Sequence, residues 1–314
     1  MLSRTADNLY WLGRYFERAE NTARMLDVAH RSALISRQDV AAADWGSVLG
    51  ISGTAKSFAT KYDKADARNV ITYMVTDLEN LTSISACIRR ARENGRALRG
   101  SITSEMWECL NETYLSLQGK DYDHVAASGF SGFFDWVKER SHLFRGVTFG
   151  TMLRDDAYHF LRLGTFLERA DNTARLLDVK YHLLLPASDA VGGVVDYYQW
   201  AALLRSVSAL RAYKHVYREA ILPWRVAELL IMREDMPRSL RASFREIDVL
   251  FGELRTRYHR DYECFRLAGD IYGKLRYGRM EEIFQGGLHE FLTDFIRRTA
   301  NLGKQIADDF QLAA

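Results

Sequence analysis

Proline is scarce in this sequence: among 314 residues it occurs only at Pro186, Pro223 and Pro237. Because proline inside a helix removes a backbone hydrogen bond and clashes with the preceding turn, its scarcity favours long helices. Runs that alternate β-branched and polar residues are also missing, as is an Asn-Gly hairpin turn flanked by such runs. We therefore expect an all-α protein with about ten to twelve helices and no sheet.

The sequence also has few cysteines and a nearly balanced charge. Cys87, Cys109 and Cys264 are odd in number and form no Cys-x-x-Cys pair, which argues against disulfides and a zinc site and favours a reducing compartment. The formal net charge is +2, so the sequence lacks the basic excess that is typical of a nucleic-acid-binding protein. No nucleic-acid partner is expected.

Long apolar runs are absent as well. No uncharged stretch approaches the roughly 18 residues of a membrane span, and residues 1–20 lack the apolar core of a secretory signal. We therefore expect a cytoplasmic protein that does not contact a membrane. Hydrophobic residues make up 47% and charged residues 27% of the chain, which is typical of a soluble globular protein.

Apolar residues instead recur at helical spacing. One series steps by three and four through Ile84, Ile88, Ala91, Gly95, Leu98 and Ile102. On this series Gly95 has no side chain, which indicates a close approach by a second helix. A similar series near the C-terminus predicts one long helix from about Met280 to Phe310.

One segment occurs twice with few changes: LGRYFERAENTARMLDV at residues 12–28 returns as LGTFLERADNTARLLDV at residues 163–179. On a helix, its recurring polar residues share one face, which we call the polar seam: Glu17, Asn21 and Arg24 in the first copy, and Glu168, Asn172 and Arg175 in the second. A solvent-exposed face would have drifted after a duplication. We therefore expect each copy of the seam to contact another part of the protein or a ligand.

Other segments match in the same order along the chain. Residues 70–90 correspond to residues 226–246, and this match places Arg89 at the position of Arg245. A period this long indicates two fused helical bundles and not a solenoid of short repeats. We predict a duplicated bundle with two pseudo-symmetric halves, residues 1–128 and 129–314, of about five to six helices each.

The sequence leaves two explanations of the polar seam open. In the structural one, the two repeated helices pack antiparallel, so that Glu17 meets Arg175 and Glu168 meets Arg24 in a self-complementary contact. In the functional one, the seam lines a pocket that holds a carboxylate, an amine or a peptide backbone. Desolvation there would raise the pKa values of Glu17 and Glu168 and make them acid/base candidates of an enzyme.

Metal and cofactor motifs are weak or missing. Asp27 and His30 have the spacing of a di-metal site in a helical bundle, but the second copy has Asp178 with Tyr181, and His182 follows one residue late. No phosphate-binding glycine loop and no nucleophile elbow are present. We expect no metal and no cofactor, and the residues alone identify no catalytic group.

Four arginines form a stripe along one predicted helix: Arg89, Arg92, Arg96 and Arg99. Like charges at this spacing repel one another. They therefore need carboxylates from neighbouring helices, such as Glu105 or Glu108, or an anionic ligand such as an acidic peptide or a phosphate.

The segments YWLGRYFERAENTARMLDV, ARENGRALRGSITSEMWECLN and FLERADNTARLLDVKYHLLL closely resemble the bacterial alpha-E family, and the resemblance covers essentially the whole chain. It implies an all-helical, duplicated fold. It also implies an association with a circularly permuted ATP-grasp ligase and transglutaminase-like peptidases, in the synthesis or tagging of a peptide or amide.

From this resemblance we predict an auxiliary helical protein that binds the ligase or its peptide substrate through the polar seam and the arginine stripe. Two alternatives stay open. One is an enzyme of the same pathway that uses the seam carboxylates Glu17 and Glu168 as acid and base. The other is a structural protein that only self-assembles into a homo-oligomer.

Overall fold

The computed structural model of the protein describes residues 3–34, 38–183 and 194–312, with side chains for residues 3–34, 45–179 and 197–312. Throughout these residues the secondary structure is helical and contains no strand, which confirms the all-α fold class. The described part contains sixteen α-helices, more than the ten to twelve expected. The number is higher because turns set off short helices of five to nine residues that the apolar periodicity does not resolve: α3 (Ala55–Ala59), α4 (Ala67–Ile71), α7 (Tyr122–Ala127), α11 (Leu210–Tyr217), α12 (Pro223–Ile231) and α15 (Met280–Gly286).

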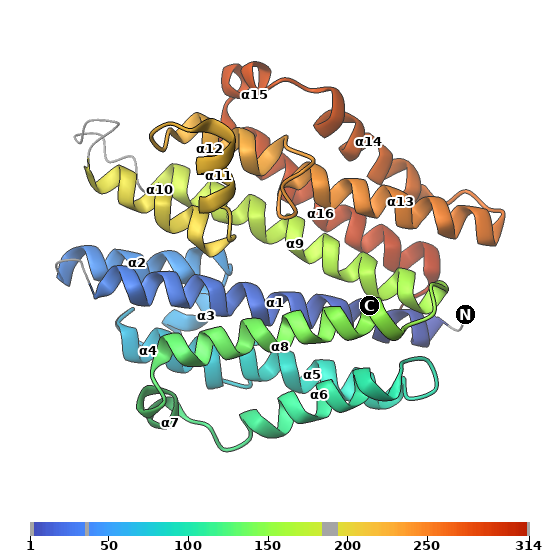
Figure 1. The fold of residues 1–314 in the computed structure, drawn as a ribbon, viewed down its shortest axis with the longest axis horizontal. Coiled ribbons are helices and arrows are strands. Elements are labelled where there is room, and N and C mark those ends of the chain that lie inside the picture. Colours follow the sequence, from blue (N-terminus) through green and yellow to red (C-terminus); the bar gives the residue numbers. More distant parts are fainter. Residues whose placement is uncertain (1–2, 35–37, 184–193, 313–314) are drawn as a thin grey trace. The chain divides into compact units, whose positions relative to one another are not determined.

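The chain divides into two compact units. Unit 1 is Met1–Glu168 with Leu312–Ala314, and unit 2 is Arg169–Gln311. The division falls inside α9 (Asp156–Leu183), so this helix contributes its first part to unit 1 and the rest to unit 2. Figure 1 shows the elements along the chain. The predicted division at residue 128 concerns sequence repeats, not compact units, and stays a prediction.

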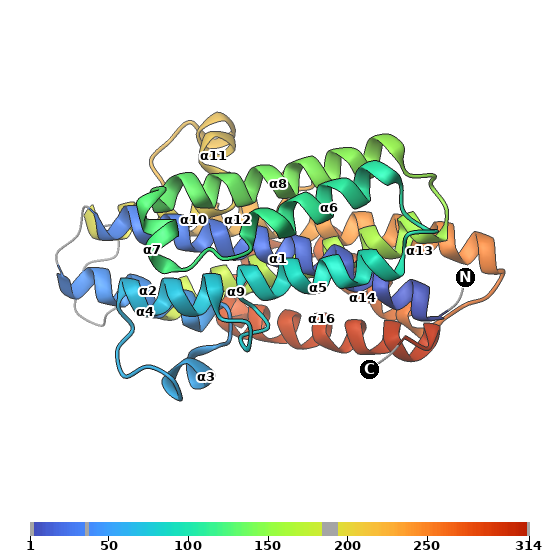
Figure 2. The same ribbon diagram turned by 90° about the horizontal axis from the view of Figure 1, so that it is seen from below.

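Unit 1 is built around α1 (Ser3–Ala33). This helix packs against α2 (Gln38–Ile51), α5 (Ile84–Ala97) and α8 (Phe130–Thr151), as Figures 1 and 2 show. Helix α6 (Ser104–Leu117) packs against both α5 and α8, and the π-helical turn η1 (Thr72–Thr76) packs against α5. From Leu12 to Asp27 every side chain of α1 is buried except two half-buried arginines. The polar face of this copy is therefore covered by other helices, like its apolar face.

Helix α5 follows the predicted apolar series. All six positions of the series are buried; the first four lie on α5, whereas Leu98 and Ile102 follow the end of the helix at Ala97. The helix begins where the Ser83 side chain caps it by accepting a hydrogen bond from the Ala86 N–H at 3.1 Å. Such a cap contributes about 1 kcal/mol. A Cβ placed on Gly95 would lie 2.5 Å from Leu110 Cδ1 of α6, which confirms the predicted close approach.

Unit 2 continues from α9 through α10–α16, and in it α13 packs against α14 and α14 against α16. The bounds of its longer helices are α10 (Val194–Ser206), α13 (Leu240–Tyr258), α14 (Glu263–Tyr277) and α16 (Leu288–Phe310). The prediction of one helix from Met280 to Phe310 is wrong. Gly287 has a φ of +91°, which interrupts the helix and separates α15 from α16, although apolar positions continue at helical spacing on both sides.

Each unit contains the same local contacts at corresponding positions. In unit 1, Thr22 donates its hydroxyl to the Thr82 carbonyl at 3.3 Å, and Ser83 caps α5. In unit 2, Thr173 donates to the Arg238 carbonyl at 3.0 Å, and Ser239 caps α13. These recurrences favour the duplication, which remains a prediction.

Candidate functional site

Two glycines set the close crossing of α1 and the first part of α9 within unit 1. A Cβ on Gly13 would lie 2.1 Å from the Leu161 carbonyl oxygen, and a Cβ on Gly164 would lie 2.0 Å from the Tyr10 carbonyl oxygen. Only glycine permits such an approach to backbone. The two glycines occupy the same position in the repeated segment, so the contact is reciprocal. It brings Glu168 against α1.

Glu168 is 6% exposed and binds two arginines of α1. Arg14 donates from Nε to Oε2 at 2.8 Å, and Arg18 donates through Nε at 2.6 Å and Nη2 at 2.9 Å to the two carboxylate oxygens. Burial alone raises the pKa of a carboxyl group, but the charges and hydrogen bonds of Arg18 and Arg14 outweigh it and lower the pKa of Glu168 to about 2. This carboxylate is therefore ionised and its two oxygens are occupied.

A second cluster of charges lies between α1 and α8. Glu17 is 1% exposed and Glu20 is fully buried. Arg145 of α8 donates from Nη1 to Glu17 Oε2 at 3.0 Å and also to Glu20 Oε2. Glu20 further accepts hydrogen bonds from Ser141 Oγ at 2.7 Å and from Arg24 Nε at 2.8 Å. We call these five residues the Arg145 cluster.

The described residues leave little free space beside Glu17 in the Arg145 cluster. Two buried carboxylates one turn apart repel each other, and Arg145 and Arg24 supply the two compensating charges. The cavity beside Glu17 and Arg145 has a volume of only about 10 Å³, on the order of the space for one water molecule. In unit 1, Glu17 and Arg24 are thus part of a buried ion-pair network.

The structure gives Glu168 and Arg24 partners other than the contact expected between them. Glu168 binds Arg14 and Arg18 and not Arg24, because Arg24 is held by Glu20 four residues earlier on its own helix. Asn21 is buried in α1. In unit 2, Asn172 is half-buried, and Arg175 donates to Asp171 Oδ2 at 2.8 Å. A pairing of Glu17 with Arg175 would join the two units and stays a prediction.

Sequence reasoning missed four important members of these networks: Arg14, Arg18, Ser141 and Arg145. Arg18 had a usable signal, because each copy of the repeated segment contains a Glu-Arg pair, at residues 17–18 and 168–169. The two α8 residues had none, since they lie outside the repeated segment and more than a hundred positions from Glu17 in the sequence.

Most of the arginine stripe is compensated, but not by Glu105 or Glu108. Arg92 pairs with Glu93 at 2.9 Å and donates to the Asn111 side chain at 3.0 Å, and Arg96 lies 3.8 Å from Glu93. Arg99 lies over the Trp107 ring, 4.4 Å from its centre. The reason is geometric: these arginines reach a glutamate on their own helix and the aromatic rings of α6.

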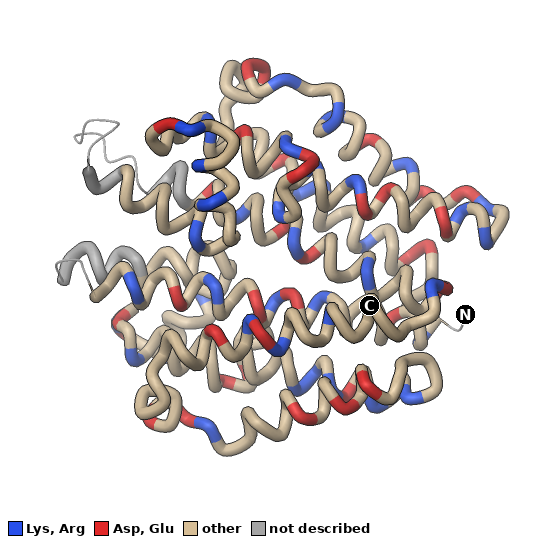
Figure 3. The backbone as a smooth tube through the Cα atoms, in the orientation of Figure 1, with Lys and Arg blue, Asp and Glu red and all other residues tan. Residues whose placement is uncertain are grey.

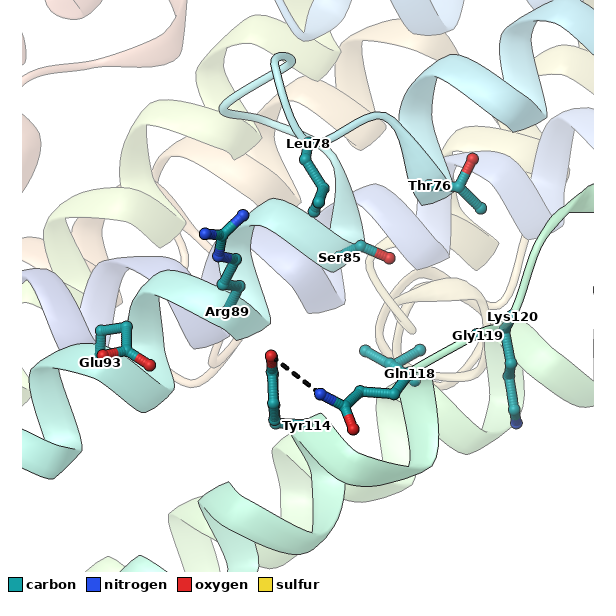
Figure 4. Close-up of a pocket in the computed structure, with 10 residues that line it drawn as sticks. Thr76, Leu78, Ser85, Arg89, Glu93, Tyr114, Gln118, Gly119 and Lys120 are labelled. Atoms are coloured by element: carbon teal, nitrogen blue, oxygen red, sulfur yellow. Dashed lines mark hydrogen bonds between the residues drawn. The ribbon is translucent and has the colours of Figure 1, made fainter.

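Arg89 differs from the rest of the stripe. It is exposed, and among the residues that the structure describes it has no ion-pair or hydrogen-bond partner. Its side chain lines a pocket of about 670 Å³ in unit 1, which we call the Arg89 pocket (Figure 4). The lining residues are Thr76, Leu78, Ser85, Arg89, Glu93, Tyr114, Leu117, Gln118, Gly119 and Lys120.

Polar residues from two helices line the Arg89 pocket. In Figure 4, Ser85, Arg89 and Glu93 extend from α5, and Tyr114 extends from α6, where its hydroxyl accepts a hydrogen bond from Gln118 Nε2 at 3.1 Å. Lys120 lies at one end of the pocket, with its Nζ 5.2 Å from the centre of the Trp136 ring. Acidic and basic residues are otherwise interspersed along the helices of each unit (Figure 3).

No metal centre emerges from the side chains that the structure describes, since none of them form a group of three or more His, Cys, Asp or Glu ligands. Asp27 binds Lys138 at 2.9 Å and Arg31 at 2.8 Å, whereas Asp178 lies 2.6 Å from His289 Nδ1. Tyr181 and His182 lie outside the described side chains. Among the described helices, none has a sufficiently long and apolar stretch to cross a bilayer.

A protein family matches nearly the whole chain. A family described as a predicted alpha-helical domain with a conserved ER motif matches residues 1–310. The repeated helices each contain a Glu-Arg pair, Glu17–Arg18 and Glu168–Arg169. Three of these four residues are those placed above in the buried networks of unit 1.

Two curated relatives are uncharacterized proteins of Mycobacterium bovis and Mycobacterium tuberculosis. Each is 26% identical to this chain over 188 residues, which is 53% of this chain and 21% of the relative. This chain therefore spans only about a fifth of the length of these relatives. No solved structure matches.

Proposed function

This chain belongs to the Alpha-E family, and from that premise we propose that it is an auxiliary protein of an ATP-grasp-dependent system for peptide or amide synthesis. It binds the ligase or the ligase's peptide substrate and does not itself carry out the reaction. Its partners are the circularly permuted ATP-grasp ligase and the transglutaminase-like protein that the family resemblance implies. All three cysteines are buried free thiols, which supports the cytoplasm as the place of action.

The state of the seam carboxylates carries this proposal. A general acid or base needs a pKa near the working pH and access to the substrate. Glu168 has a pKa of about 2 and binds two arginines, and Glu17 is buried against Arg145 beside a cavity of about 10 Å³. These features favour an ion-pair network that holds the bundle together over the alternative of an enzyme that uses Glu17 and Glu168.

The binding surface is then better assigned to the Arg89 pocket than to the polar seam. Its volume of about 670 Å³ lies within the range of roughly 300–1,000 Å³ that is common for ligand sites, and its polar groups are accessible. The mycobacterial relatives extend well beyond the matched stretch, which supports a module that works together with further domains.

The direct test is co-expression of this chain with a circularly permuted ATP-grasp ligase, followed by co-purification and by a ligase assay with and without this chain. We expect a complex, or a higher ligase turnover when this chain is present. If the two proteins neither form a complex nor affect turnover, the proposal is wrong. A chain that purifies only as a homo-oligomer under these conditions would favour the self-assembly alternative.

The enzyme alternative makes a different prediction for Glu168→Gln. If Glu168 is an acid/base group, this substitution abolishes turnover while the melting temperature stays nearly unchanged. If Glu168 belongs to a structural ion-pair network, the melting temperature falls and the folded variant still supports the ligase. Glu17→Gln provides the same test for the Arg145 cluster.

A further inference from the structure

Arginines at equivalent positions of the two units have different partners. Arg245 of unit 2 occupies the position of Arg89 when residues 70–90 are matched to residues 226–246. The Arg245 guanidinium binds two carboxylates of its own unit, Glu234 Oε1 at 3.3 Å and Glu246 Oε1 at 2.7 Å. In unit 2, this arginine is therefore neutralised from within the chain.

In unit 1 the corresponding carboxylates are missing. Leu78 stands at the position of Glu234, and Arg90 stands at the position of Glu246. Arg90 turns to α1, where its Nη1 donates to the Tyr15 hydroxyl at 3.2 Å. Leu78 and Arg89 both line the pocket instead of pairing.

A third difference between the units leaves space beside Arg89. In unit 2, Glu234 also binds Arg241 at 2.8 Å, so one carboxylate bridges two arginines. Arg241 corresponds to Ser85, whose short side chain lines the Arg89 pocket. Unit 1 thus keeps the guanidinium but lacks the carboxylate that unit 2 provides for it, and a pocket with a hydroxyl group lies beside it.

We infer that the Arg89 pocket binds a carboxylate of an acidic peptide, which takes the role that Glu234 plays in unit 2. This inference rests on the proposed binding function and specifies the chemistry of the peptide. Arg89 offers two parallel N–H donors that match a carboxylate. The Ser85 hydroxyl and the Gln118 side chain are further polar groups in the same pocket.

The remaining charges in the pocket are compatible with a single carboxylate. Glu93 is the acidic residue among the lining side chains, and its charge is compensated by Arg92 at 2.9 Å and Arg96 at 3.8 Å. Lys120 adds a second cation at one end of the pocket. A peptide with several acidic side chains can place one carboxylate on Arg89 and another near Lys120.

The experiment titrates the purified full chain with acetyl-Glu-Glu-Glu-amide and follows binding by calorimetry. The control peptide is acetyl-Gln-Gln-Gln-amide, which has the same shape without the charges. We expect the glutamate peptide to bind at least about tenfold more tightly, since charge-assisted pairs with Arg exceed neutral hydrogen bonds in strength.

Two substitutions with matched controls test the site itself. Arg89→Leu removes the guanidinium, and Leu78→Glu supplies the carboxylate that unit 2 has at this position, so each should weaken peptide binding about tenfold or more. Arg245→Leu is the control for Arg89→Leu. Leu81→Glu is the control for Leu78→Glu, because Leu81 is similarly exposed (48% against 50%) but does not line the pocket. Both controls should bind the peptide like the unchanged chain, and circular dichroism confirms that all four variants fold.

Several results would overturn the inference. They are equal binding of the two peptides, unchanged binding by Arg89→Leu or by Leu78→Glu in a folded chain, and inorganic phosphate that displaces the peptide at lower concentration than free glutamate does. The ligase test is independent. If the chain binds the peptide but forms no complex with the ligase and does not affect its turnover, the peptide site stands and the proposed partner is refuted. If the Arg89→Leu variant loses the peptide but still binds the ligase, the result supports both the peptide site and the proposed partner.

Discussion

The same ion pair occurs in both copies of the repeated helix, but its surroundings differ. Glu20 and Arg24 are 0% and 9% exposed at their side chains, whereas Asp171 and Arg175 are 20% and 37% exposed, although both pairs are separated by 2.8 Å. In the first copy, Arg145 and Ser141 of α8 complete the coordination of Glu20. A recurring sequence thus specifies the pair itself, while residues outside the repeat decide how deeply it is buried.

The repeated glutamates illustrate the same point. Glu168 binds Arg14 and Arg18 of α1. The position of Arg14 in the second copy holds Thr165, whose hydroxyl donates to the Leu161 carbonyl at 3.1 Å. Glu17 binds Arg145 from α8. The two glutamates therefore occupy equivalent positions of the repeat but have partners from different helices.

The largest effect is expected for Arg145→Met, which removes the cation that Glu17 and Glu20 share. Two buried carboxylates then remain with too little compensating charge, and the free energy of unfolding should fall by about 3–5 kcal/mol. Urea unfolding at pH 7 measures it. Arg297→Met is the matched control on α16, where the exposed pair with Asp294 should contribute less than about 1 kcal/mol. Equal losses in the two variants would show that the Arg145 cluster is not a buried network.

Gly13→Ala and Gly164→Ala test the reciprocal helix crossing. In each case the new Cβ would meet a backbone carbonyl oxygen at about 2 Å, so the helices must separate, and we expect a loss of about 3 kcal/mol. Gly146→Ala on α8 is the control, because nothing lies within 4 Å of its Cβ position. There alanine should stabilise the helix by about 1 kcal/mol. Thermal unfolding that shows the same sign for all three variants would contradict the crossing.

Replacing each of the two equivalent arginines by glutamine tests how much the pair stabilises each copy. Arg24→Gln leaves the fully buried Glu20 with less charge compensation and should cost about 2–3 kcal/mol. Arg175→Gln disrupts a pair that solvent partly screens and should cost about 0.5 kcal/mol. Chemical unfolding of both variants in one buffer measures the difference. A larger loss for Arg175→Gln would reverse the assignment of the two environments.

An effect smaller than that of Arg24→Gln, and equal in both units, is expected for the helix caps. Ser83 and Ser239 each accept a hydrogen bond from the backbone N–H three residues later, at 3.1 and 2.9 Å. Replacing either serine by alanine should cost about 1 kcal/mol. If thermal unfolding shows that only one of the two substitutions matters, the units do not share this element.

The helical class follows from properties that the sequence displays directly, such as the low proline content and the apolar series from Ile84 to Ile102. The break at Gly287 did not follow from periodicity, because the apolar pattern continues across it and only the backbone angle of one residue changes. Burial of Glu17 and Glu168 could be predicted from their recurrence. The identity of their partners could not, since it depends on which helix crosses α1 and at what distance.

Glu168 is an ionised carboxylate held by two arginines, which favours a structural role over acid/base catalysis. Burial opposes ionisation of Glu168, but Arg18 and Arg14 lower its pKa from 4.5 to about 2. Its contribution to stability, up to about 3 kcal/mol, should thus be fully present above about pH 4.5 and be lost as the pH falls towards 2.

The most direct measurement is an NMR titration of the side-chain carboxyl carbon of Glu168 in the intact, ¹³C-labelled chain, with Glu168→Gln to assign the signal. We predict that the carboxyl group titrates with a midpoint near pH 2 and is therefore ionised at neutral pH. A midpoint above 4.5, and above all one near neutral pH, would contradict this prediction and favour the enzyme alternative.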